Sequence, residues 1–357
     1  MDLLGLLREL VARTTVSGDA RAQRDALGTL TDVLRDRAPH LEVTTGRDPD
    51  HPWTLLRTPT DPTRRQLLLA CHVDTVPVPD PGAWSRDPFG AELDGGRVWG
   101  RGGSDMKAGV VAAVAALAAA DPETPAALLL TSDEEIGSKG AAAAAAAVAE
   151  QSIGAVVVPE ATGNQVVLGH KGALWLAVRT AGRAAHGSTP ERGHNAVLDL
   201  AALLGRAGGT LPFRTDPFLG TETWNPGVVA GGTVPNVVPE RAEVVIDMRT
   251  VADGGELLDW WRTQPEVADV EVRVDLPPVG TPADDPWVAG LPAPVLPAPA
   301  TYFTDASVLG QVVGGAPVVV WGPGTPAVMH AVDEYVELAE LEQAAAAFTE
   351  VAARWRG

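Results

Sequence analysis

Short apolar runs alternate with alanine-rich runs through the first part of this 357-residue chain. The runs at 66–70, 126–131 and 155–158 are rich in leucine or valine and have the length of buried strands. Between them, 109–120 and 140–150 are rich in alanine, the strongest helix former. This alternation predicts an α/β fold in which a mainly parallel sheet is flanked by helices.

The middle of the chain has a different pattern. Alternating or β-branched runs at 174–180, 243–249 and 270–274 predict strands, and 195–207 and 256–262 predict helices between them. We therefore expect a small inserted α+β domain, which a proline-rich connector closes. The first pattern then returns with a predicted strand at 316–321 and a helix at 338–355. The predicted domains are 1–168 together with 280–357, and the insert 169–279.

The charge balance argues against a polyanionic partner. The chain has 27 Lys and Arg against 46 Asp and Glu, for a net charge of −19, so nucleic acid would be repelled. No run is long and apolar enough to predict a membrane span. The single cysteine, Cys71, cannot form an internal disulfide, and we expect a cytoplasmic protein.

Residues of the types that bind metals follow predicted strands in five segments. In LLLACHVDTVP, His72 follows a predicted strand, and Asp74 lies two residues on, where both side chains can point to the same side of an extended backbone. A zinc-binding histidine often has its second ring nitrogen held by a carboxylate, which Asp74 could supply. Taken alone, this pair also fits a structural histidine.

Acidic residues mark three further segments. Asp105 precedes a predicted helix, where an isolated aspartate usually caps the helix. Glu134 and Glu135 are adjacent, and two such charges either lie exposed at the surface or are held by a cation. Glu160 directly follows the strand at 155–158, and it also fits an ordinary loop residue.

The fifth segment contains His330, in the loop at 322–336. Because the carboxyl ends of parallel strands meet at one edge of an α/β sheet, we expect these five segments to converge. Mixed histidine and carboxylate ligands suit zinc, and two ions about 3.5–4 Å apart can activate one water molecule. The sequence therefore predicts a dizinc site at this edge.

The motifs resemble those of a known family. HVDTVP at 72–77, GGSDMKAG at 102–109, TSDEEIG at 131–137, the loop around His330 and GGTVPNVVPERAEVVIDMR at 231–249 match in order and spacing. The chain resembles the acetylornithine deacetylase and succinyl-diaminopimelate desuccinylase family of dizinc hydrolases, which includes glutamate carboxypeptidase, aminoacylases and dipeptidases. The resemblance implies a zinc-exopeptidase-like catalytic domain, an inserted lid and dimerisation domain, and a homodimer.

The resemblance also implies roles for individual residues. Asp105 would bridge two Zn²⁺ ions per chain, for which Co²⁺ or Mn²⁺ could substitute, and the bond from Asp105 to Met106 would be cis. Glu134 would be the general base, with Asp74 behind His72. The remaining ligands would be His72 and Glu160 for one ion, and Glu135 and His330 for the other.

Substrate contacts are implied in the same way. His186 would polarise the scissile carbonyl from the lid domain. Lys171 stands where some desuccinylases have arginine, which leaves a succinyl preference open. The positions implied to contact the substrate are Lys171, Asn236, Arg249, Thr304, Asp305 and Gly324.

We therefore expect a metal-dependent hydrolase that cleaves the amide bond of a small N-acyl amino acid, as a deacetylase or desuccinylase does. A dipeptidase or carboxypeptidase acting on short peptides with the same site is the alternative, and a carbamoyl-amino-acid hydrolase is a more distant one. A non-catalytic binding protein of this fold would have lost at least one ligand position, and all are present here.

Overall fold

The computed structural model describes residues 1–61 and 63–357. The chain divides into two compact units. The first comprises Met1–Gly169 and Val279–Gly357, and the second comprises His170–Pro278. Each unit has its own cluster of buried apolar side chains.

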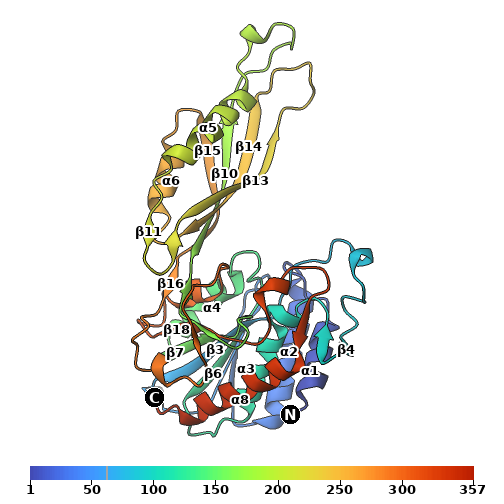
Figure 1. Cartoon of the computed structure of the whole chain (residues 1–357), viewed down its shortest axis with the longest axis vertical. Coiled ribbons are helices and arrows are strands. Elements are labelled where there is room, and N and C mark those ends of the chain that lie inside the picture. Colours follow the sequence, from blue (N-terminus) through green and yellow to red (C-terminus); the bar gives the residue numbers. More distant parts are fainter. Residues whose placement is uncertain (62) are drawn as a thin grey trace. The chain divides into compact units, whose positions relative to one another are not determined.

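An eight-stranded sheet lies at the centre of the first unit (Figure 1). Its middle strands are parallel and are, in spatial order, β6 (Ala126–Thr131), β3 (Gln66–His72), β7 (Ile153–Val158) and β18 (Val318–Val320). The outer strands are β1 (Glu42–Thr45) and β2 (Thr54–Arg57) beyond β6, and β8 (Val166–Val167) and β17 (Val295–Leu296) beyond β18. Every residue of β3, β6 and β7 is buried, as expected for parallel strands covered on both faces. The predicted α/β fold with a mainly parallel sheet is confirmed.

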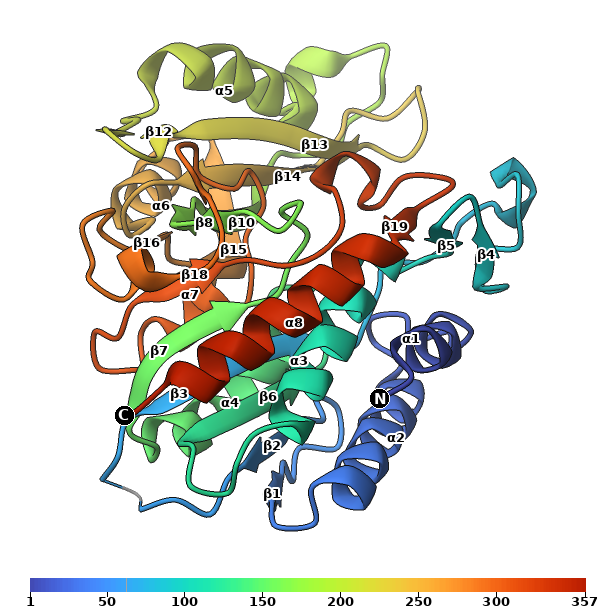
Figure 2. The same ribbon diagram turned by 60° about the horizontal axis from the view of Figure 1, so that its bottom comes forward.

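Helices cover both faces of this sheet. On one face, α3 (Ala108–Ala118) packs against β3 and β6, and α8 runs beside it in Figure 2. On the other face, α4 packs against the side chains of Leu68 and Leu129, which point away from α3 because successive strand residues alternate. The helices of this unit are α1 (Leu3–Val11), α2 (Ala20–Arg37), α3, α4 (Lys139–Ala149), α7 (Ala306–Leu309) and α8 (Leu338–Arg354).

A turn precedes α3, and a small sheet contacts this turn. The turn Gly103–Lys107 leads into α3, and its Asp105–Met106 peptide bond is cis, as the resemblance implied. Its neighbour is a three-stranded sheet of β4 (Glu92–Asp94), β5 (Arg97–Trp99) and β19 (Tyr335–Glu337).

The second unit is a four-stranded antiparallel sheet with two helices on one face. The order is β13 (Thr223–Gly231), β14 (Arg241–Thr250), β10 (Gly172–Ala181) and β15 (Val267–Leu276). Alternate side chains of β10 and β14 pack with the buried Trp261 of α6 (Gly255–Arg262) and with α5 (Ala196–Thr210). A short hairpin of β11 (Thr215–Asp216) and β12 (Gly220–Thr221) completes it. The sequence did not predict β13, because Pro226 interrupts its pattern; proline is tolerated there because β13 is an edge strand with a bulge at Pro226.

Among the described residues, no helix combines the length and the apolar character that crossing a membrane would require.

Candidate metal centre

His72 and Glu160 reach the same edge of the main sheet. β3 ends at His72, and its parallel neighbour β7 ends two residues before Glu160. His72 Nε2 lies 3.0 Å from Glu160 Oε1, and both side chains are buried. His72 Nδ1 lies 3.1 Å from the backbone oxygen of Asp74 and 3.4 Å from its carboxylate, so Asp74 holds the ring through both groups.

Asp105 faces two histidines with its two oxygens. Its Oδ1 lies 3.3 Å from His72 Nε2, and its Oδ2 lies 3.1 Å from His330 Nε2. His330 Nε2 also lies 3.0 Å from Glu135 Oε2. Two groups of potential ligands therefore share Asp105. The first group is His72, Asp105 and Glu160, and the second group is Asp105, Glu135 and His330.

Glu134 lies beside these groups and is also buried. Its backbone N–H donates to Asp74 Oδ1 at 3.1 Å, and the N–H of Glu135 donates to Asp74 Oδ2 at 3.3 Å. Asp74 therefore positions the Glu134–Glu135 turn as well as His72. Within the described residues, Glu134 Oε1 and Glu160 Oε2 are buried without a hydrogen-bond partner.

Burial and crowding shift the pKa values of these acids. Burial, together with the charge of Asp105, raises the pKa values of Glu135 and Glu160 to about 7. Burial also raises the pKa of Glu134 well above its usual value. Hydrogen bonds that His330 donates to the carboxylates of Asp105 and Glu135 raise the pKa of His330 to about 10. Clustered acids with unpartnered oxygens beside two imidazoles form a donor set that fits two divalent cations.

The sequence analysis missed Asp133, a buried residue directly before Glu134 that links this turn to distant segments of the chain. Its carboxylate accepts hydrogen bonds from the backbone N–H of Gly18 at 2.7 Å and from Gln23 Nε2 at 2.8 Å. His51 Nδ1 lies 2.7 Å from its second oxygen. The only signal in the sequence was its position directly before Glu134, which does not reveal such distant partners.

Three predicted substrate contacts lie in the first unit. Thr304 and Asp305 are fully buried, and Asp305 accepts a hydrogen bond from Thr131 Oγ1 at 2.5 Å. Gly324 has a φ of 97°, and a Cβ there would lie 2.3 Å from Ser104 Oγ, so glycine allows its loop to pack on the turn that carries Asp105. Their contact with a substrate stays a prediction.

The other four predicted residues belong to the second unit. His186 is exposed, and its Nδ1 lies 2.7 Å from Ser188 Oγ. The segment around Asn236 lies beside it, since the Gly187 N–H donates to the Asn236 backbone oxygen. Arg249 Nε and Nη2 each lie 3.0 Å from an oxygen of Asp247, and Lys171 Nζ donates to the backbone oxygen of Thr221.

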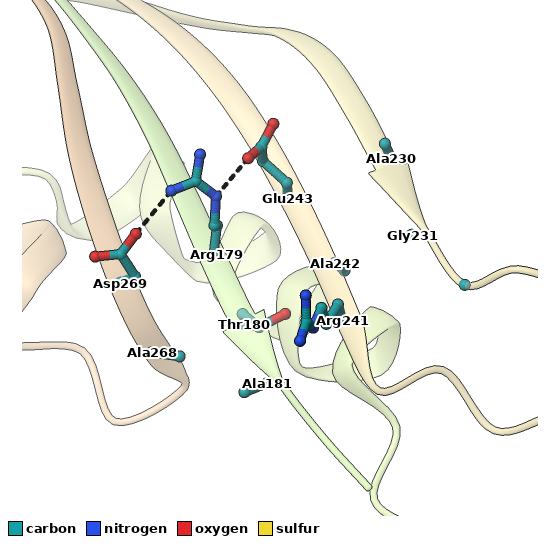
Figure 3. A pocket seen from close by; sticks show the side chains of 11 residues that line it. Arg179, Thr180, Ala181, Ala230, Gly231, Arg241, Ala242, Glu243, Ala268 and Asp269 are labelled. Carbon is teal, nitrogen blue, oxygen red and sulfur yellow. Dashed lines mark hydrogen bonds and ion pairs between the residues drawn. The ribbon is translucent and has the colours of Figure 1, made fainter. Parts of the chain in front are cut away.

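A hollow of about 520 Å³ on the second unit contains none of the predicted site residues. Figure 3 shows Arg179 at its wall, between Glu243 at 2.6 Å and Asp269 at 2.7 Å. Arg179 also pairs with Glu271, so the charge there is already balanced by carboxylates. The candidate metal ligands lie instead in the first unit.

Comparison with known proteins shows the family of this chain. Residues 68–354 match the Peptidase family M20/M25/M40. A succinyl-diaminopimelate desuccinylase of Maricaulis maris is 31% identical over 318 residues, which cover 80% of each chain. An M20 family metallo-carboxypeptidase of Sulfolobus solfataricus has the same fold, with a TM-score of 0.81 at 18% identity over 99% of this chain and 98% of that one. The YXEP protein of Bacillus subtilis, a dinuclear metal-binding peptidase of the M20 family, matches with a TM-score of 0.67 at 14% identity over 98% and 96%. This chain therefore belongs to the M20/M25/M40 peptidase family and is a metal-dependent hydrolase that acts on amide bonds.

Proposed function

We propose that this protein is a dizinc hydrolase that removes the acyl group from a small N-acyl amino acid. The observation that carries this proposal is the sharing of Asp105, whose two oxygens face His72 and His330 separately. A carboxylate in this position suits two ions held side by side. Zinc is the ion that mixed histidine and carboxylate ligands favour, and Co²⁺ or Mn²⁺ could replace it.

His72 and Glu160 would hold one ion and Glu135 and His330 the other, with Asp105 between them. When bound, the ions would polarise the substrate carbonyl and make a water molecule a stronger nucleophile near neutral pH.

Glu134 would act as the general base. Its buried Oε1 has no partner among the described residues, and Asp74 fixes its backbone. The carboxylate would take a proton from the attacking water and then deliver it to the leaving amine nitrogen. His186 would donate a hydrogen bond to the developing oxyanion.

Cationic and polar groups of the second unit would bind the substrate carboxylate. Arg249 offers a planar fork that already forms a bidentate pair with Asp247, which demonstrates the geometry that a carboxylate needs. Lys171 and Asn236 would complete this contact, and the surroundings of Thr304, Asp305 and Gly324 would shape the acyl pocket. A deacylase of the desuccinylase type is favoured because the Maricaulis maris relative is a desuccinylase.

A substrate panel tests the proposal. The purified protein would be loaded with Zn²⁺ and given N-succinyl, N-acetyl, N-formyl and N-carbamoyl amino acids beside dipeptides, and free amine would be measured. We expect release from an N-acyl amino acid and two equivalents of zinc per chain. Cleavage of dipeptides alone would identify the alternative, a dipeptidase or carboxypeptidase with the same site. Two bound ions without any hydrolysis would contradict the proposal.

We also propose that the protein is a homodimer that assembles through its second unit. β13 is an edge strand, and the Val228 and Val229 side chains on it are 60% and 59% exposed. Leu198 on α5 is 65% exposed. Unpaired strand edges with apolar side chains readily pair with another chain. Light scattering should give twice the chain mass, and Val229→Lys should shift the protein towards the monomer.

The cytoplasmic location stays a prediction. Cys71 is buried and unpaired, which fits a reducing compartment. Cell fractionation with an antibody against the protein would test it.

A further inference from the structure

A buried ion pair lies behind the turn that carries Asp105. Arg101 Nη1 lies 2.6 Å from Glu334 Oε2, and the two side chains are 4% and 0% exposed. The guanidinium group also lies over the Trp84 ring, 5.2 Å from its centre. Neither Arg101 nor Glu334 belongs to the ligand groups described above.

Each partner of this pair holds the chain segment of the other. Glu334 follows His330 by four residues, and its Oε1 accepts hydrogen bonds from the N–H groups of Ser104 at 2.9 Å and Asp105 at 3.1 Å. Arg101 precedes Asp105 by four residues, and its Nη2 donates to the His330 backbone oxygen at 3.3 Å. The ion pair therefore fastens two ligand-bearing segments to each other reciprocally.

The two ligand groups differ in how much they need such a fastening. His72 ends β3, and Glu160 lies two residues after the parallel neighbour β7, so the sheet itself sets their separation. Asp105 and His330 lie in irregular segments, and His330 has a φ of 61° and a side chain that is 51% exposed. A left-handed backbone at a residue other than glycine persists only where surrounding contacts impose it.

Stability alone is a weak reason for such a pair. Burying two charges removes both from water, and their mutual attraction often only offsets this cost. A positioning role accounts for contacts that end on the backbone of both ligand segments.

We propose that Arg101 and Glu334 are positioning residues that hold Asp105 and His330 for the metal ion bound with Glu135. This inference rests on the proposed dizinc function. We call the ion held by His72 and Glu160 the first ion, and the ion held by Glu135 and His330 the second ion. Loss of the Arg101–Glu334 pair should weaken binding of the second ion far more than binding of the first, because His72 and Glu160 keep their places on the sheet.

The test is a titration of metal-free protein with Zn²⁺, by calorimetry and with a chromophoric chelator as competitor. Glu334→Gln should bind the first ion within about threefold of the wild type, and the second roughly 10–100-fold more weakly, the range known for groups that orient metal ligands. Glu337→Gln is the matched control, because Glu337 lies on the same segment as Glu334 and also pairs with an arginine. Its partner is Arg97 at 2.7 Å, and the side chains of Glu337 and Arg97 are 37% and 41% exposed. It should bind both ions as the wild type does.

Arg101→Lys keeps the positive charge but lacks the planar fork that reaches both Glu334 and the His330 backbone. The affinity of Arg101→Lys for the second ion should lie between those of the wild type and Glu334→Gln. Thermal unfolding of the metal-free variants should report whether they remain folded. Unchanged affinity in folded Glu334→Gln, or equal weakening of both ions, would overturn the positioning role. A wild-type protein that binds fewer than two ions would instead overturn the dizinc function.

Discussion

The two units of this protein present their predicted site residues in opposite ways. In the first, His72, Asp105 and Glu160 are buried, and His72 Nε2 lies 3.3 Å from Asp105 and 3.0 Å from Glu160. In the second, His186 and Asn236 are exposed, and their described partners belong to their own unit. The candidate metal ligands therefore all come from the first unit, and we predict that the second unit contributes groups that act only on a bound substrate. Variants in the two units should therefore fail in different ways.

The largest effect should come from Asp105→Ala. Both ligand groups use Asp105, so its loss should lower the zinc content of the protein and abolish measurable turnover. Metal analysis after dialysis, together with the amine-release assay, measures both. Full zinc occupancy in this variant would show that another residue bridges the ions.

Glu134→Gln should separate chemistry from metal binding within the first unit. The amide cannot accept the proton of the attacking water, so we expect kcat to fall about 10²–10⁴-fold, the range typical of a lost general base. Zinc content should remain at two equivalents, because Glu134 belongs to neither ligand group. A kcat within tenfold of the wild type would remove Glu134 from this role.

His186→Ala should lower kcat by about 10²–10³-fold while zinc content stays unchanged, because the lost group acts on the oxyanion. If the dimer places His186 in the partner's site, then mixing inactive His186→Ala with inactive Glu134→Gln should restore part of the activity. One hybrid site would then contain an intact base and an intact histidine. No restoration despite proven subunit exchange would mean that the histidine acts within its own chain or has no role.

Arg249→Lys should have the smallest effect. Lysine keeps the charge but loses the fork, so we expect KM for an N-acyl amino acid to rise about tenfold, or about 1.4 kcal/mol of binding. kcat should change less than threefold. Arg241→Lys, on the same strand and the same face of the sheet, is the control and should leave both constants unchanged. Equal changes in the two variants would point to the general charge of that face and not to a specific contact.

The fold and the ligand types could be read from the sequence because both follow local rules. Strands β3, β6 and β7 are mainly apolar runs. His72 is the last residue of β3, and Glu160 lies two residues after β7. Strand β13 could not be read in this way. This edge strand pairs with β14, and because Pro226 lies within it, its sequence lacks the alternation of apolar and polar residues that predicts a strand.

By itself, the sequence determined which residue types gather at one edge of an α/β sheet, since metal chemistry demands imidazole and carboxylate groups and parallel strands bring their ends together. Only the tertiary structure decided which oxygen of Asp105 faces which histidine. It also decided that Arg101 pairs with Glu334, 233 residues away. From sequence alone, such charged residues are expected to be exposed. Their burial and their choice of partner depend on contacts between distant segments, which no local pattern encodes.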